Sequence, residues 1–158
     1  CNLVKSRFPN VKIYGSTQNM SKKEILLERG FDEILEDKEY VLQTEETFDK
    51  VLELVGPRSI KDSIKHANRF GVVCSAGQLG EQWYLEDFDP IMELRNDIYL
   101  TTFYSGLVDS SRLNEMFKFI DKYNVVVRPS KVFNLNEIQE AHQYIESKKG
   151  FGKVVCLV

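Results

Sequence analysis

The chain has 158 residues, a hydrophobic content of 42%, a charged content of 28% and a formal net charge of −3. The length fits one ordinary domain, and the composition is that of a folded globular protein. The slight negative charge gives no long-range attraction to nucleic acids or anionic lipids, and every apolar run is far shorter than the roughly 20 residues that span a bilayer. We therefore expect neither a nucleic-acid partner nor a membrane partner.

The first part of the chain alternates between helix and strand. Leu3, Val4 and Phe8 stand at helical spacing, and Pro9 ends the helix that they predict. Residues 11–14 alternate apolar and polar side chains, which is typical of a strand. A polar turn follows this strand.

A second helix and a short strand come next. Ser21 and Glu24 have the spacing of a capping box, and Gly30 offers a left-handed exit from the helix. A short strand is expected at residues 31–35. The acidic stretch at residues 36–46 predicts a solvated loop, to which we assign no chemistry.

The middle of the chain repeats this alternation. Residues 48–55 predict a buried strand that stops at Gly56. Residues 59–67 predict a helix, and residues 71–77 the next strand. Strands that alternate with short helices and end at glycine or a small polar residue are typical of a parallel sheet with crossover helices. The sequence therefore predicts the α/β class.

The pattern changes after Gly80. Residues 83–90 form an irregular aromatic connection, and residues 98–103 predict a strand at the edge of the sheet. Ser110 or Ser111 then caps a helix with one apolar face, which we expect to pack in the core. That face consists of Leu113, Met116, Phe117 and Ile120.

The last part of the chain predicts a separate βαβ unit. An apolar run at residues 125–129 and a strand at residues 153–158 flank a helix at residues 134–147. We place the boundary before this unit near Tyr123.

Ligands of open parallel sheets bind beyond the carboxyl ends of the strands, where loops and helix N-termini present unpaired backbone N–H groups. Glycines and small residues at these ends let a flat ring or a pyrophosphate approach the backbone. We therefore expect the functional site at four strand ends, which are residues 15–19, 54–56, 75–77 and 103–106.

The first of these ends bears on the choice of cofactor. An acid there would accept hydrogen bonds from the ribose diol of NAD, and its absence leaves room for the 2′-phosphate of NADP. The turn offers only neutral side chains, and Lys22 and Lys23 follow it, so NADP is favoured. The alternative, in which Ser21 is a plain helix cap and both lysines are solvated, stays open. The neutral side chains are those of Ser16, Thr17, Gln18 and Asn19.

Metal and hydrolytic chemistry find little support in the sequence. Cys1, Cys74 and Cys156 are widely scattered and form no CxxC pair. Only His66 and His142 could add nitrogen ligands, so we expect no metal site, and neither histidine stands in a pattern typical of a catalytic base. Free thiols without a disulfide framework favour a reducing cytoplasm.

Several segments together carry a family resemblance. They are GFDEIL at residues 30–35, FDKVLELVG at 48–56, GVV at 71–73, WYLEDFDP at 83–90, LTTF at 100–103, VFNLNEI at 132–138 with AH at 141–142, and GKVV at 152–155. In this order and spacing the chain resembles the medium-chain dehydrogenase/reductase superfamily and, within it, the zinc-independent quinone oxidoreductase-like branch. The resemblance covers nearly the whole chain.

The resemblance implies a GroES-like catalytic domain, a Rossmann dinucleotide-binding domain and a C-terminal return segment that packs on the catalytic domain. Residues 1–123 would be a partial Rossmann domain that starts after the glycine-rich phosphate loop, and residues 124–158 the return segment. Gln18 stands where many relatives carry Arg, which leaves Lys22 and the hydroxyls to hold a 2′-phosphate. We expect no catalytic side chain in this chain. The implied cofactor-binding residues are Ser16, Thr17, Gln18, Asn19, Lys22, Val55, Gly56, Ala76, Gly77, Phe103 and Tyr104.

The implied reaction is hydride transfer from NADPH to a quinone, an enone or a related carbonyl, and we expect this chain alone to be inactive. The strand at residues 98–103 resembles the edge through which dimers of the family join, so a homodimer is expected. Two alternatives remain: the cofactor part of a zinc-dependent alcohol dehydrogenase, and a non-catalytic Rossmann-like module that dimerises. A methyltransferase is disfavoured because its second strand normally ends in an acid.

Overall fold

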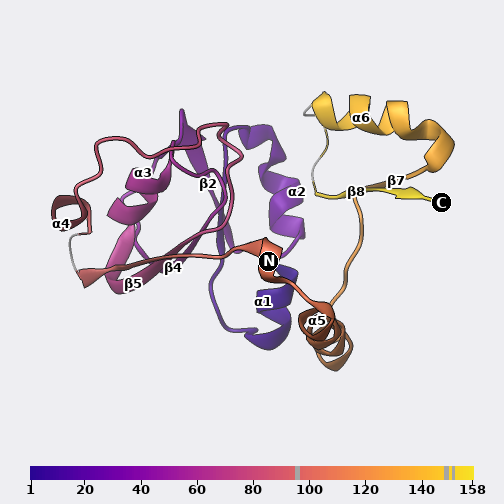
Figure 1. Cartoon of the computed structure of the whole chain (residues 1–158), viewed down its shortest axis with the longest axis horizontal. Coiled ribbons are helices and arrows are strands. Elements are labelled where there is room, and N and C mark those ends of the chain that lie inside the picture. The colour runs from indigo at the N-terminus through magenta and orange to yellow at the C-terminus, as the bar shows by residue number, and fades with distance from the viewer. Residues whose placement is uncertain (95–96, 148–149, 151) are drawn as a thin grey trace.

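The helices and strands form one larger body and one smaller lobe (Figure 1). The computed structural model describes residues 1–94, 97–147, 150 and 152–158. The strands are β1 (Tyr14–Thr17), β2 (Glu33–Lys38), β3 (Val41–Leu42), β4 (Phe48–Glu53), β5 (Ala67–Ser75), β6 (Tyr99–Thr102), β7 (Lys131–Asn134) and β8 (Val154–Leu157). The α-helices are α1 (Asn2–Arg7), α2 (Lys23–Glu28), α3 (Ile60–Lys65), α4 (Pro90–Glu93), α5 (Ser110–Lys122) and α6 (Ile138–Glu146).

The strands of the larger body pair mainly in parallel. β1 pairs with β2 along its whole length. β4, β5 and β6 form a second parallel set, in which Glu53, Ser75 and Thr102 lie side by side. Helix α2 connects β1 to β2, and α3 connects β4 to β5. This arrangement is the parallel sheet with crossover helices that the sequence predicts, and it confirms the Rossmann-type α/β class.

The larger body contains two half-sheets. The first half-sheet consists of β1, β2 and β3, and the second half-sheet of β4, β5 and β6. Within the described ranges, no ladder of backbone hydrogen bonds joins β1 to β4. The two strands approach each other at their first residues, where the ring centres of Tyr14 and Phe48 lie 5.0 Å apart. The half-sheets therefore meet through side chains.

The second half-sheet and α3 carry the main hydrophobic core. Ile60 and Ile64 lie on one face of α3, four residues apart, and both are buried. They pack with Ala67 at the start of β5, with the fully buried Val73 further along the same strand, and with Ile98 just before β6. This core holds α3 against β5 and the start of β6.

The first strand begins three residues later than the sequence predicts. β1 starts at Tyr14 instead of ending there, because residue 13 is held outside the ladder by Asp32. The Asp32 carboxylate accepts the backbone N–H of Ile13 at 2.6 Å, and the Asp32 N–H donates to the carbonyl of Ile13 at 2.8 Å. Tyr14 therefore lies at the amino end of the sheet and not at its carboxyl end.

The acidic stretch forms a hairpin instead of the solvated loop that the sequence predicts. β2 continues to Lys38 and turns back into β3. The two turn residues, Glu39 and Tyr40, have φ values of 50° and 71°, the left-handed conformation that a tight two-residue hairpin turn requires. The Asp37 carboxylate accepts the Tyr40 N–H at 2.8 Å and holds this turn.

Two helix starts also differ from the prediction. The side chain of Asn19, and not Ser21, caps the helical segment before α2 by accepting a backbone N–H. Asp109, and not Ser110 or Ser111, caps α5 in the same way. The predicted exit of α2 at Gly30 is confirmed, since this glycine has a φ of 96°.

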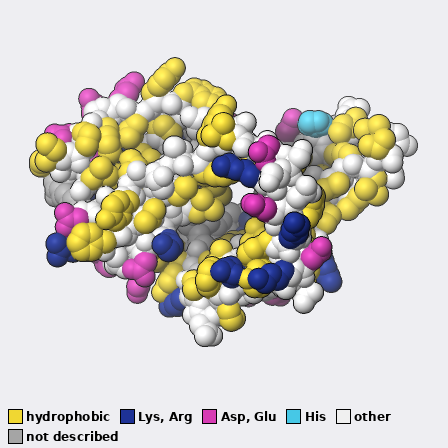
Figure 2. Space-filling view, turned by 60° about the horizontal axis from the view of Figure 1, so that its bottom comes forward, with side chains coloured by type: hydrophobic (Ala, Val, Ile, Leu, Met, Phe, Trp, Pro, Cys, Tyr) yellow, Lys and Arg dark blue, Asp and Glu magenta, His cyan; other side chains and the backbone are white. Residues whose placement is uncertain are grey.

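The apolar face of α5 is exposed, although the sequence predicts a core position for it. Phe117 is 56% exposed, Leu113 and Met116 are each more than 40% exposed, and no residue of α5 is buried. Figure 2 shows hydrophobic side chains over much of the face that it displays. Helical spacing predicts which residues share a face, but it does not determine whether another element covers that face.

The smaller lobe is the βαβ unit that the sequence predicts. β7 and β8 pair in parallel, with α6 packed against them (Figure 1). The first strand of this unit lies at Lys131–Asn134 and not at residues 125–129. The capping box between Asn134 and Glu137 starts the helical segment at the point where β7 ends. No helix within the described part of the chain is long and apolar enough to cross a membrane.

Candidate functional site

The three strands of the second half-sheet end at one rim. Because Glu53, Ser75 and Thr102 are aligned in neighbouring parallel strands, the segments that follow them leave from the same edge. The N–H of Ala76 donates to the carbonyl of Glu53 at 2.8 Å, and the N–H of Phe103 to that of Ser75 at 3.3 Å. The strand ends that the sequence singles out in this half-sheet are therefore neighbours.

A pocket of about 310 Å³ lies where the ends of the two half-sheets meet. It joins the end of β1, the end of β2 with the turn that follows it, the segment after β4, and the loop after β5. Four of its seven lining residues are cofactor-binding residues predicted from the sequence. The lining residues are Ser16, Thr17, Gln18, Asp37, Tyr40, Val55 and Leu79.

A buried carboxylate fixes the backbone beside Val55. Glu53 is 4% exposed, and its side chain accepts the N–H of Val55 at 2.7 Å and that of Gly56 at 2.8 Å. The same carboxylate accepts the hydroxyl of Ser59 at 2.7 Å. Hydrogen bonds to a charged acceptor are stronger than neutral ones, so they hold the turn between β4 and α3 in one conformation.

Two glycines allow close approach at this rim. A Cβ atom on Gly77 would lie 2.3 Å from the carbonyl oxygen of Leu54, and a Cβ on Gly56 would lie 2.9 Å from that of Gly77. Gly56 also has a φ of 91°, which disfavours any other residue. The N–H of Gly80 then donates to the carbonyl of Val55 at 2.8 Å. The chain after β5 is thus locked against the chain after β4.

Two of the residues predicted to bind the 2′-phosphate lie outside the pocket lining. Asn19 caps the helical segment that follows β1. The ammonium group of Lys22 donates to the carbonyl oxygen of Gly150 at 3.1 Å. This bond connects the residue directly before α2 to the C-terminal segment. The structure therefore gives both side chains a structural contact.

The other predicted residues lie further along the rim. Gly56 is buried in the turn after β4, and Ala76 and Gly77 follow β5. Phe103 and Tyr104 follow β6 and are 53% and 70% exposed. The structure brings these residues to the same edge as the pocket without making them part of its lining.

Sequence reasoning missed Asp37, Tyr40 and Leu79. The amide nitrogen of Gln18 lies 3.5 Å from a carboxylate oxygen of Asp37, and the guanidinium carbon of Arg58 lies 5.3 Å from the ring centre of Tyr40. The parallel pairing of β1 and β2 could have found Asp37, since the carboxyl ends of neighbouring parallel strands meet at one edge. Because Asp37 lies in an acidic stretch at residues 36–46, the sequence pattern predicted a solvated loop for it.

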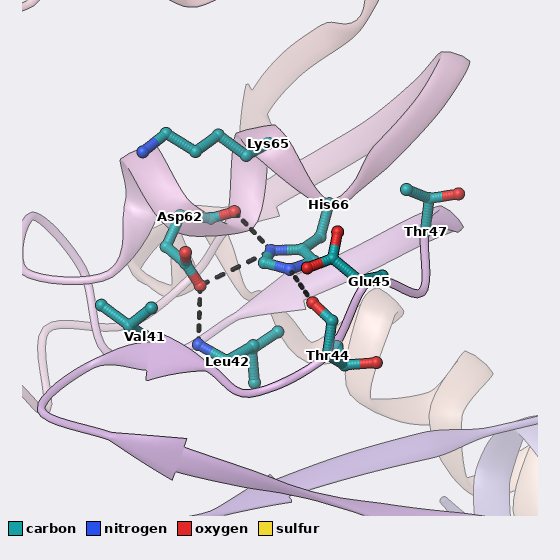
Figure 3. A pocket seen from close by; sticks show the side chains of 8 residues that line it. All are labelled: Val41, Leu42, Thr44, Glu45, Thr47, Asp62, Lys65 and His66. Atoms are coloured by element: carbon teal, nitrogen blue, oxygen red, sulfur yellow. Dashed lines mark hydrogen bonds and ion pairs between the residues drawn. The ribbon is translucent and has the colours of Figure 1, made fainter.

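A second hollow, of about 350 Å³, lies beside His66. Figure 3 shows the His66 ring between Asp62 and Thr44. Its Nδ1 lies 2.9 Å from the carbonyl oxygen of Asp62 and 3.5 Å from the carboxylate, and its Nε2 lies 3.1 Å from the carbonyl oxygen of Thr44. The Asp62 carboxylate also accepts the N–H of Leu42 at 2.9 Å. These contacts tie the first half-sheet to α3, so we interpret the cluster as structural.

Two side chains with a shifted pKa, Asp32 and Lys12, lie away from the pocket, around the start of β1. The Lys5 ammonium nitrogen lies 2.6 Å from a carboxylate oxygen of Asp32. Its hydrogen bond lowers the pKa of Asp32, and the hydrogen bond from the N–H of Ile13 lowers this pKa further. The hydrogen bond with Tyr14 raises the pKa of Lys12. Both shifts concern exposed groups that stabilise the strand start.

Metal ligands are scattered in the folded chain. Over the residues with described positions, no group of three or more His, Cys, Asp and Glu side chains is placed to hold a metal ion. The three cysteines are free thiols, and each is partly buried.

A comparison with known families matches most of the chain. The family model described as zinc-binding dehydrogenase matches residues 29–156. None of the curated proteins compared with this chain is a significant match in sequence.

Solved structures share the fold. An NAD-dependent alcohol dehydrogenase is 19% identical to this chain, with a TM-score of 0.74. The match covers 99% of this chain and 46% of the dehydrogenase. The yhdH oxidoreductase from Salmonella enterica in complex with NADP is 14% identical, with coverages of 99% and 49% and a TM-score of 0.75. The Bacillus subtilis protein yhfP with NAD bound is 15% identical, with coverages of 99% and 49% and a TM-score of 0.74. The chain spans about half the length of the solved structures that it matches.

Proposed function

This chain belongs to the zinc-binding dehydrogenase family, and from that premise we propose that it is the cofactor-binding part of an oxidoreductase that uses NAD(P)H. The proposed reaction transfers hydride from the dinucleotide to a quinone, an enone or a related carbonyl. The observation that carries the proposal is the pocket in which Ser16, Thr17 and Gln18 meet Val55 at the carboxyl ends of the two half-sheets.

The lining of the pocket fits the adenosine end of such a dinucleotide. The hydroxyls of Ser16 and Thr17 and the amide of Gln18 offer hydrogen-bond partners to a ribose. Val55 and Leu79 offer apolar walls to a purine ring, and ligand pockets commonly combine apolar walls with a few polar groups. On the sequence alone NADP is favoured. Since the folded pocket also contains Asp37, the choice between the two dinucleotides depends on this carboxylate.

The rim of the second half-sheet would guide the rest of the dinucleotide. Glu53 keeps the backbone of Val55 and Gly56 in place, so binding would not have to order this turn. Phe103 and Tyr104, both more than half exposed, would face the nicotinamide end. The dinucleotide would supply the hydride, and the residues of this chain would bind and orient it.

The family description implies zinc, and the described residues of this chain do not fit a zinc site. They place no three His, Cys, Asp or Glu side chains together, whereas protein zinc sites have at least three such ligands. The proposed role of this chain therefore involves no metal ligand. A zinc-dependent alcohol dehydrogenase, the other activity that the sequence leaves open, would need ligands beyond the residues that the structure describes.

We also propose that these 158 residues alone bind the dinucleotide weakly and do not turn it over. The sequence contains no GxGxxG loop, whose backbone N–H groups bind the pyrophosphate in Rossmann domains. Calorimetric titration of the chain with NADPH should give a dissociation constant weaker than micromolar. A micromolar constant would contradict this expectation.

We propose the same division of the chain that the resemblance implies, with residues 1–123 as a partial Rossmann domain and residues 124–158 as a return segment for a catalytic domain. The support is the separate β7–β8 pair, which forms its own small sheet. The free thiols support our further proposal that the protein works in the reducing cytoplasm.

The free edge of β6 supports a homodimer. In the described sheets β6 pairs with β5 alone, and Tyr99 on this strand is 58% exposed. Pairing with a second copy would cover an edge that otherwise invites aggregation. The alternative is a non-catalytic module that dimerises through the same edge. Light scattering that shows a dimer, together with a calorimetric titration that shows no dinucleotide binding, would favour the module.

An activity screen tests the proposed function. A polypeptide that contains these residues together with the proposed catalytic domain is assayed with NADH and NADPH against quinones, enones and alcohols. Thr17→Trp should fill the pocket and raise the KM for the dinucleotide at least about tenfold, because it displaces the ribose. Thr44→Trp, in the hollow beside His66, is the matched control and should change that KM less than about twofold. The reverse order of effects, or no turnover with any pair of substrates, would contradict the proposal.

A further inference from the structure

The sequence has no acid in the turn after the first strand, but the folded chain brings one to the same place. We propose that Asp37 accepts hydrogen bonds from the adenosine ribose diol and that its negative charge excludes a 2′-phosphate, so that this protein uses NAD and not NADP. This inference rests on the proposed function. It reverses the cofactor preference that the sequence alone favours.

Asp37 reaches the pocket from the neighbouring strand. β1 and β2 run in parallel with Thr17 opposite Glu36, so Gln18 and Asp37 follow at the same edge. The Gln18 Nε2 lies 3.5 Å from the Asp37 Oδ1, and both side chains line the pocket. An acid from the second strand of the pair thus stands beside the end of the first strand, where Rossmann domains place the ribose acceptor.

The hairpin turn fixes this carboxylate. The Tyr40 N–H donates to the Asp37 Oδ1 at 2.8 Å, and both turn residues, Glu39 and Tyr40, adopt a left-handed conformation that side chains rarely adopt. The Arg58 guanidinium lies against the Tyr40 ring, 5.3 Å from its centre. Here the turn presents Asp37 and the Tyr40 ring to the pocket.

The carboxylate in the lining of the pocket opposes a phosphate, and the Arg58 guanidinium beside the pocket lies over the Tyr40 ring, 5.3 Å from its centre. Among the lining residues that the structure describes, Asp37 carries the one charged side chain. Lys22, which the sequence assigns to the 2′-phosphate, donates to the carbonyl of Gly150 at 3.1 Å, and Lys38 pairs with Glu36 at 3.3 Å. A carboxylate and a phosphate at contact distance repel each other, whereas a carboxylate and two hydroxyls form charge-assisted hydrogen bonds. The pocket therefore suits the unmodified diol.

An NMR titration of the isotope-labelled 158-residue chain tests this inference with two small probes. The probe 5′-AMP has a free ribose diol, and 2′,5′-ADP differs from it only by the 2′-phosphate. We expect 5′-AMP to shift the amide signals of Ser16, Thr17 and Asp37 and to bind at least about tenfold more tightly than 2′,5′-ADP.

Asp37→Asn removes the charge but keeps an oxygen for the Tyr40 N–H. It should bring the two dissociation constants to within about threefold of each other. Glu36→Gln is the matched control, because it removes a charge from the same strand outside the pocket, and it should leave the preference unchanged. Asp37→Ser provides the same comparison should the asparagine variant lose the dispersed amide spectrum of a folded protein.

The outcomes separate this inference from the proposed function. A preference of the unmodified chain for 2′,5′-ADP, or a preference for 5′-AMP that both Asp37 variants retain, overturns the role of Asp37 and leaves the proposed function standing. If neither probe shifts any signal around the pocket at millimolar concentration, where weak binding is detected, the proposed function fails, and this inference fails with it.

Discussion

The two half-sheets of the larger body end side by side, but they are stabilised in different ways. The second half-sheet packs with α3 around Ile60, Ile64 and Val73, so burial of apolar side chains stabilises it. The first half-sheet buries only Ile34 and Leu35 among its described strand residues. Alongside the Tyr14–Phe48 ring contact, polar contacts attach it to the rest of the molecule.

Those polar contacts lie at both ends of the first half-sheet. The Lys5–Asp32 ion pair holds its amino end, and the Asp62–Leu42 hydrogen bond holds β3 against α3. The main hydrophobic core lies in the second half-sheet, and the side chains that we propose for dinucleotide recognition lie mainly in the first half-sheet. Substitutions in the second half-sheet should therefore change folding most, and substitutions in the first half-sheet should change binding most.

Ile64→Ala should have the largest effect on folding. Ile64 is 4% exposed in the core of the second half-sheet, so its truncation should lower the free energy of unfolding by about 2–5 kcal/mol. Ile91→Ala removes the same atoms from a side chain that is 87% exposed, and it should cost less than about 0.5 kcal/mol. Urea denaturation measures both. Equal losses would show that the second half-sheet has no distinct core.

Glu53→Ala should come next. The substitution leaves the partly buried N–H of Val55, the buried N–H of Gly56 and the hydroxyl of Ser59 without their acceptor, at a cost of about 2–4 kcal/mol. Glu36→Ala breaks only an exposed pair with a lysine and should cost less than about 1 kcal/mol. Thermal unfolding followed by circular dichroism compares the two variants. A small loss for Glu53→Ala would mean that water or another group replaces the carboxylate.

Gly77→Ala should cost about 1–3 kcal/mol, because its Cβ would overlap the backbone of Leu54 and force the ends of β4 and β5 apart. Gly106→Ala is the control. Its Cβ would meet only the ring of Tyr104, which is 70% exposed and free to move, so the loss should stay below about 0.5 kcal/mol. Chemical denaturation distinguishes them, and a tolerated Gly77→Ala would argue against close contact at the rim.

Asp32→Asn should have the smallest effect, and that effect should depend on pH. Lys5 and the N–H of Ile13 hold the pKa of Asp32 below its usual value of 3.8. A lowered pKa means that the carboxylate stabilises the fold above that value, and that this contribution is lost as the pH falls through the pKa of the folded state. Thermal unfolding of both proteins should therefore differ at neutral pH and converge in strong acid. A difference that is the same at every pH would contradict this assignment.

Local patterns predicted the types of most elements but not their limits. The spacing of Ile60 and Ile64 predicts α3 and its buried face correctly, because helix periodicity is a property of neighbouring residues. The predicted start of β1 was wrong by three residues. Contacts with Asp32, which directly precedes β2, keep residue 13 outside the ladder. The buried position predicted for Phe117 was wrong because no local pattern shows whether another element covers a helix face.

The sequence by itself determined the alternation of strands and helices, and with it the strand ends at Gln18 and Val55 as the place to look for a ligand. Only the tertiary structure decided that Asp37 joins these ends and that Lys22 contacts Gly150 instead. The physical reason is that periodicity and turn chemistry act between near neighbours in the chain. Which side chains share a pocket depends on strand pairing and packing between distant segments.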